Sequence, residues 1–125
     1  MLAPSTSEIG QIAFVVSDVA AAKRFFVEAL GLSHLFDAGP NLSFIAAGST
    51  RLMLTPPQGH GQVGANSILY FKVPSVDAAF RAATARGAVA EREPQLATKM
   101  PDHELWIGFV RDGDRNLIGL MEERR

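Results

Sequence analysis

The sequence contains no cysteine and carries almost no net charge. The lack of cysteine excludes disulfide bonds, thiolate metal ligands and a cysteine nucleophile; it fits a reducing compartment, and we expect a cytoplasmic protein. A net charge of −1 gives no electrostatic reason to expect binding to nucleic acid or to an anionic membrane. There is no run of about 18 apolar residues to span a membrane. The first eight residues also lack the basic and apolar regions of a signal peptide.

The composition is that of a soluble globular domain. Hydrophobic residues make up 47% of the 125 positions and charged residues 20%. This length is sufficient for one domain with a hydrophobic core and too short for two.

One stretch of the chain occurs twice, 57 residues apart. Residues 10–26 read GQIAFVVSDVAAAKRFF, and residues 67–83 read SILYFKVPSVDAAFRAA. Each copy is an apolar strand followed by a short polar turn and an amphipathic helix, with Asp18 or Ser75 as the N-cap. The chain therefore consists of two similar halves.

Hydrophobic periodicity and turn residues predict the order strand, helix, strand, strand, strand in each half. The expected strands are 9–16, which we expect to be buried on both faces, 32–37, 42–47, 51–55, 68–73, 88–91, 104–110 and 116–122. The expected helices are 19–30 and 76–86. Residues 92–101 are expected to be a loop and residues 123–125 a frayed tail. The predicted organisation is a lead-in at 1–8 and one domain at 9–122, with module 1 at about 9–55, a linker at 56–66 that includes His60 as a solvated loop residue, and module 2 at about 67–122.

Three motifs resemble the vicinal oxygen chelate superfamily of glyoxalases, bleomycin resistance proteins and extradiol dioxygenases. They are Val-x-Asp-Val at 16–19, Phe-Phe-x-x-x-Leu-Gly-Leu at 25–32, and Phe-Val-Arg-Asp-Gly-Asp-Arg-Asn-Leu at 109–117. The last is similar to the family's Phe-x-x-Asp-Pro-Asp-Gly-Asn turn, with Gly113 at the usual proline and Arg115 at the usual glycine. The resemblance implies an α+β fold in which two βαβββ modules pair into an incomplete eight-stranded barrel with a central cavity. It also implies a homodimer.

The resemblance further implies four metal-ligand positions, which fall on Gln11, Met53, Ile68 and Gly119. A hard divalent ion needs carboxylate, carbonyl or imidazole donors. This set offers one amide oxygen and one weak thioether. We therefore predict no divalent metal and no other cofactor, which argues against the metal-dependent glyoxalase, epimerase and dioxygenase mechanisms.

The strand faces that carry these four positions are expected to line a mainly apolar cavity for a small molecule. The predicted ligand-binding residues are Gln11, Ala13, Phe44, Arg51, Met53, Ile68, Tyr70, His103, Trp106, Gly119 and Met121. The alternative is that these side chains simply fill the barrel.

His103 is the candidate catalytic residue. It stands in Met100-Pro-Asp-His-Glu-Leu-Trp106, near the expected rim of the cavity, and a histidine beside carboxylates can serve as a general acid or base. The alternative is a surface loop with His103 solvated and Trp106 in the core.

These residues support three hypotheses. The first is a glyoxalase/bleomycin-resistance-like protein that binds a small apolar or aromatic molecule without the usual metal. The second is a lyase, isomerase or dioxygenase-type enzyme that uses His103 as acid or base, or a divalent metal at a non-standard site. The third is a structural partner domain that acts through a dimer interface.

Overall fold

A computed structural model describes residues 8–59 and 61–125 of the chain. His60, and all but the last residue of the expected lead-in at 1–8, lie outside the described residues. The elements follow in the order β1 (Gln11–Val15), α1 (Val19–Arg24), η1 (Phe25–Ala29), β2 (Ser33–Asp37), β3 (Ser43–Ala47), β4 (Thr50–Thr55), β5 (Leu69–Lys72), α2 (Val76–Ala85), β6 (Val89–Lys99), β7 (Glu104–Arg111) and β8 (Leu117–Arg124).

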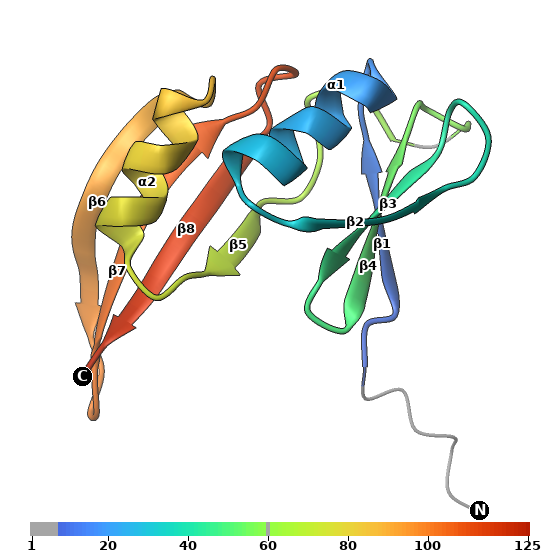
Figure 1. The fold of residues 1–125 in the computed structure, drawn as a ribbon. Helices are drawn as coiled ribbons and strands as arrows, with labels where there is room; N and C mark the ends of the chain where they lie inside the picture. The colour runs from blue at the N-terminus through green and yellow to red at the C-terminus, as the bar shows by residue number, and fades with distance from the viewer. Residues whose placement is uncertain (1–7, 60) are drawn as a thin grey trace, which may run out of the picture.

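Each half of the chain forms its own four-stranded sheet. Sheet A has the strand order β1-β4-β3-β2, and sheet B has the matching order β5-β8-β7-β6. In both, the first and last strands of the module pair in parallel and the other pairs are antiparallel. The predicted α+β fold of two βαβββ modules is thus confirmed. The sheets lie side by side, with their helices on the same side (Figure 1), and do not close into a barrel within the chain.

The helices begin and end where local chemistry dictates. Asp18 accepts a hydrogen bond from the Ala21 amide at 3.0 Å, and Ser75 accepts one from the Ala78 amide at 3.2 Å, so each side chain satisfies a free amide of the first turn. Gly31 and Gly87, with φ of 76° and 108°, follow the helices in a conformation that favours glycine. The first helix ends in a turn that is wider than an α-helical one, because its last residues, η1, form a π-helix in which the Leu30 amide donates to the Phe25 carbonyl five residues earlier.

The hydrophobic core lies between the helices and one face of each sheet. Its fully buried members include Phe14, Phe26, Ile45, Leu52, Leu54, Val76, Val110 and Ile118. Phe26 packs edge-on against Phe14, with ring centroids 5.4 Å apart, and also contacts Phe71 of β5, with centroids 6.3 Å apart and the rings tilted by 60°. One aromatic side chain therefore joins the two modules into a single core.

Three local expectations are wrong. Residues 92–99 are not a loop but part of β6, an edge strand with three register irregularities, in which Pro94 is tolerated because one side of the strand needs no partner. The C-terminal tail is not frayed, because β8 continues to Arg124 and ion pairs hold Arg124 and Arg125. The strand at 9–16 is not buried on both faces along its whole length, because Gln11 and Ala13 are exposed on the face on which only Val15 is buried.

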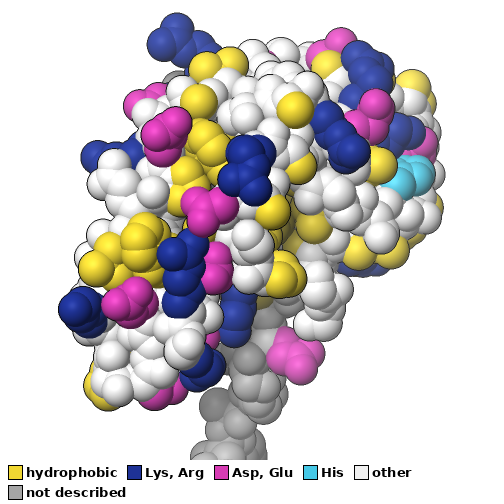
Figure 2. Space-filling model, turned by 60° about the vertical axis from the view of Figure 1, so that its left-hand side comes forward, with side chains coloured by type: hydrophobic (Ala, Val, Ile, Leu, Met, Phe, Trp, Pro, Cys, Tyr) yellow, Lys and Arg dark blue, Asp and Glu magenta, His cyan; other side chains and the backbone are white. Residues whose placement is uncertain are grey.

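Charges of both signs are mixed over the face of the molecule drawn in Figure 2. Figure 2 shows Lys and Arg side chains interspersed with Asp and Glu, and apolar side chains between them. None of the described helices has the length and apolar character to cross a membrane.

Candidate ligand-binding site

The candidate site lies on the sheet faces that point away from the helices. Strand alternation places every second residue there. We call these surfaces open face A (Gln11, Ala13, Phe36, Phe44, Arg51 and Met53) and open face B (Tyr70, Lys72, Ile107, Phe109, Gly119, Met121 and Glu123), following the strand register.

Open face A brings together five residues predicted from the sequence. Gln11 and Arg51 are register partners on β1 and β4, and so are Ala13 and Met53. The Arg51 guanidinium donates to Gln11 Oε1 at 2.9 Å, and Gln11 Nε2 donates to the Met53 sulfur at 3.5 Å. Phe44 lies beside Met53 in the register and beneath Arg51, whose guanidinium carbon is 5.5 Å from the ring centroid. The result is an aromatic and thioether surface that carries one cation.

Phe36 extends this surface, although the sequence did not suggest it. Its ring stacks on Phe44 with centroids 4.5 Å apart and planes 19° apart. Phe36 is 44% exposed, whereas Phe44 is buried, so Phe36 presents the outer ring of the stack to solvent. Strict alternation within β2 failed to identify it because a register irregularity lies between His34 and Phe36.

Open face B is built around Tyr70, which is register partner to Gly119. A Cβ atom placed on Gly119 would lie 2.5 Å from Tyr70 Cδ2, so the ring occupies the space that any side chain at Gly119 would need. Phe109, the other register partner of Gly119, meets Tyr70 edge-on with centroids 5.7 Å apart. Met121 lies further along β8 on the same face, and Tyr70 itself is 48% exposed. The sequence contained a signal for Phe109, because it lies an even number of positions after the predicted residue His103 and side chains alternate between the two faces of a strand.

The four metal-ligand positions implied by the resemblance do not suit a divalent ion. Gln11 uses its oxygen for Arg51, and Met53 offers only a thioether. Ile68 has no donor, and Tyr70 covers Gly119. Within the described part of the chain, no group of three or more His, Cys, Asp or Glu side chains is placed to hold a metal ion.

A cleft of about 370 Å³ separates the two modules next to Tyr70. It is lined by Ile12, Leu32, Ala47, Gly48, Thr50, Leu52, Leu69, Tyr70, Phe71 and Lys72. Only Tyr70 of the predicted site residues lines it. The others were not identified because the cleft lies between β5 and the ends of β1 and β4, and a repeat pattern does not reveal how two modules approach each other.

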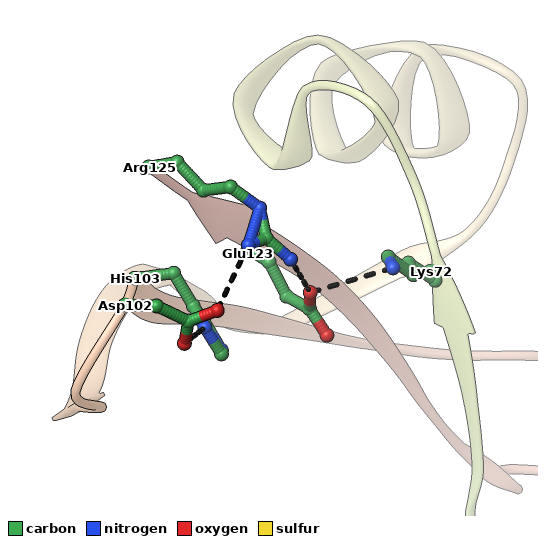
Figure 3. A network of polar contacts seen from close by, with 5 residues as sticks. All are labelled: Lys72, Asp102, His103, Glu123 and Arg125. Carbon is green, nitrogen blue, oxygen red and sulfur yellow. Dashed lines mark hydrogen bonds and ion pairs between the residues drawn. The ribbon is translucent and has the colours of Figure 1, made fainter.

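His103 lies at the end of open face B, within a chain of charged contacts (Figure 3). His103 Nδ1 is 2.7 Å from Asp102 Oδ1, and Arg125 binds the other oxygen of Asp102 at 3.1 Å. Arg125 also binds Glu123, whose Oε1 lies 3.4 Å from Lys72 Nζ. The imidazole of His103, and after it the charge of Arg125, hold the pKa of Asp102 below its usual value, so this carboxyl stays ionised beside the ring.

Trp106 points to the other face of sheet B. Its indole nitrogen donates to Glu104 at 3.0 Å, and the Arg124 guanidinium lies 4.1 Å from the indole ring. The indole packs against the hydrophobic core on the helix side. Trp106 is therefore not brought together with Tyr70. Ile68, just before β5, is exposed.

Comparison with solved structures finds this fold in other proteins. A member of the glyoxalase/bleomycin resistance protein/dioxygenase superfamily from Sphaerobacter thermophilus DSM 20745 is 25% identical, with a TM-score of 0.77 over 94% of this chain and 98% of that chain. TnmS3, an antibiotic binding protein from Streptomyces sp. CB03234, is 24% identical, with a TM-score of 0.76 over 97% and 99%. The lactoylglutathione lyase from Agrobacterium tumefaciens is 21% identical, with a TM-score of 0.69 over 95% and 96%. A comparison with curated proteins gave no match.

The sequence profile of one family matches residues 8–120, which is nearly the whole described chain. The motifs at 16–19, 25–32 and 109–117 lie within this match, and so do both sheets up to the middle of β8. The chain therefore belongs to the Glyoxalase/Bleomycin resistance protein/Dioxygenase superfamily.

Proposed function

We propose that this protein binds a small apolar or aromatic molecule, with no divalent metal at Gln11, Met53, Ile68 and Gly119. The observation that carries the proposal is the pair of Tyr70 and Gly119. The tyrosine ring takes the space in which a ligand side chain at Gly119 would begin, and it exposes an aromatic face there. The solved relative TnmS3 is described as an antibiotic binding protein, which is consistent with this use of the fold.

The cleft beside Tyr70 supports the proposal by its size and its lining. A volume of about 370 Å³ falls in the range of small-molecule sites, and most of its lining side chains are apolar. Phe36 and Tyr70 are each nearly half exposed. Covering such surface with a planar ligand contributes roughly 25 cal/mol for each Å² of apolar area removed from water.

We further propose that the protein acts as a homodimer in the cytoplasm. Two four-stranded sheets lie side by side in one chain, whereas a barrel requires two sheet faces to oppose each other. Open face A of one copy set against open face B of a second copy would meet that requirement and would enclose the ligand. The cytoplasmic location rests on the absence of cysteine.

Binding of 1-naphthalenemethanol, measured by isothermal titration calorimetry, tests the proposal. We expect Tyr70→Ala to weaken binding at least fivefold, because the variant loses the exposed ring. Leu96→Ala is the matched control, since Leu96 is 40% exposed and pairs with Trp106 on the opposite face of sheet B. Absence of binding to the wild type, or about one equivalent of Fe, Mn, Ni or Zn in protein purified without chelators, would overturn it.

A second candidate function is an enzyme that uses His103 as acid or base. It is favoured by the contact with Asp102, because a carboxylate at Nδ1 holds that nitrogen protonated and leaves Nε2 as the base. The side chain of His103 is also 14% exposed, so a substrate at the end of open face B could reach it. For any substrate that the wild type turns over, His103→Gln should lower kcat at least a hundredfold. An unchanged kcat would show that His103 does not act as a general acid or base.

A further inference from the structure

Arg51 is the cation of open face A, and it has no anionic partner among the residues that the structure describes. The side chain is exposed on open face A, and its contacts are the neutral amide of Gln11 at 2.9 Å and the ring of Phe44 at 5.5 Å. Among residues 8–59 and 61–125, no carboxylate forms an ion pair with it. Arg111, Arg124 and Arg125, by contrast, each bind at least one carboxylate.

The two contacts hold the Arg51 guanidinium in place without neutralising its charge. Gln11 accepts from Nη2, and the N–H donors of Nε and Nη1 make no hydrogen bond to the described residues. A guanidinium presents its donors in a planar fork that matches the two oxygens of a carboxylate. Because the fork is already oriented by Gln11 and Phe44, less side-chain entropy is lost when an anion binds.

The surface next to this cation is flat and aromatic. Phe44 lies under the guanidinium, and Phe36 stacks on Phe44 with its outer side exposed. The Met53 thioether lies beside Phe44 on the neighbouring strand. Aromatic rings and a thioether favour contact with a planar ring, so the surface combines a site for a ring with a site for a negative charge.

We infer that the ligand of this protein is a planar aromatic acid whose carboxylate pairs with Arg51 while its ring packs against Phe36 and Met53. This inference rests on the proposed binding function and narrows it to an anionic class of ligand. Arg51 acts as the residue that determines specificity for charge, and the rings supply contact area common to charged and neutral ligands.

Isothermal titration calorimetry with 1-naphthoate and with its neutral counterpart 1-naphthamide tests the inference. At low ionic strength, the wild type should bind the acid at least fivefold more tightly than the amide. Arg51→Gln should abolish this preference while the affinity for the amide stays within twofold. Arg81→Gln, which removes an equal charge from an exposed position on α2, should retain the preference.

The outcomes separate this inference from the proposed function. Equal affinity of the wild type for the two compounds, or a preference that survives in Arg51→Gln, would overturn the role of Arg51 and leave the binding function standing. Failure of the wild type to bind either compound or 1-naphthalenemethanol would overturn both. If Arg81→Gln also lost the preference for the acid over the amide, that preference would be an effect of the protein's net charge. This outcome would overturn the inference as well.

Discussion

In the second module, a glycine stands in a strand and an arginine stands in a turn conformation that usually carries glycine. Gly119 stands in a regular strand, where its missing side chain is needed because the Tyr70 ring lies over it. Arg115 has a φ of 68° in the turn between β7 and β8, a conformation that favours glycine and costs other residues about 1 kcal/mol or more. Arg115 is also the position at which the resembling family motif carries glycine.

Arg115→Gly should therefore stabilise the protein by up to about 1 kcal/mol, because relief of the backbone strain exceeds the entropy that glycine adds to the unfolded chain. The hydrogen bond from the Arg115 amide to the Asp112 carbonyl involves the backbone and is retained. Urea denaturation of both proteins measures the difference. Arg115→Ala is the control, since it removes the same side chain and keeps the strained Cβ; equal stability of the two variants would contradict the explanation.

At the scale of the element, α2 depends on a residue from a distant strand. The Val76 amide in its first turn donates to Glu122 Oε1 of β8 at 2.9 Å, in addition to the cap that Ser75 provides. A carboxylate at a helix N-terminus is stabilised by the free amides and by the helix dipole. The Val76 amide, followed by the Arg124 guanidinium, holds the pKa of Glu122 below its usual value of 4.5.

The stability of the protein should consequently fall in acid partly through Glu122. A carboxyl whose pKa is lower in the folded state contributes stability above the unfolded value of 4.5, and this contribution is lost as the pH falls through the folded value. Glu122→Gln should be about 1 kcal/mol less stable at pH 7 and should lose less stability below pH 4.5 than the wild type. Denaturant titrations between neutral and acidic pH compare the slopes; parallel curves would show that Glu122 contributes nothing.

At the scale of the whole molecule, the arrangement of the modules leaves both open faces uncovered by the residues that the structure describes. Phe26 joins the modules through Phe14 and Phe71, and it does so on the helix side only. The other side of each sheet exposes large apolar groups, Phe36 on sheet A and Tyr70 on sheet B. Exposed apolar surface of this kind marks an interface or a ligand site.

If the homodimer proposed above forms through these faces, sedimentation equilibrium should give twice the 13.4 kDa mass of the chain. Phe36→Asp should shift the population to the monomer, because it places a charge in the apolar interface. Leu96→Asp is the control, since this equally exposed residue lies on the helix-side face of the edge strand β6. A wild-type monomer, or a Phe36→Asp dimer of unchanged strength, would contradict the proposed interface.

Most of the fold could be predicted from local patterns. The repeat predicted two βαβββ modules, and Asp18 and Ser75 predicted the helix starts where they are found. Residues 92–99 could not be predicted as strand, because proline and charged residues resemble a loop unless the strand is known to lie at an edge. Within the site, the alternation of side chains along each strand correctly grouped Gln11, Arg51 and Met53 on one face. It could not place Trp106, whose side depends on the register of β7 against β8.

The sequence by itself thus determined the two modules, their helices and the parity of the sheet faces, because these follow from residue periodicity and local hydrogen bonding. Only the tertiary structure decided that the sheets lie side by side, that Tyr70 covers Gly119, and that Phe36 and Phe44 stack near Arg51, which pairs with no carboxylate of the described residues. These features arise from contacts between residues far apart in the chain, with Phe26 packing across both modules, and such contacts leave no periodic signal in the sequence.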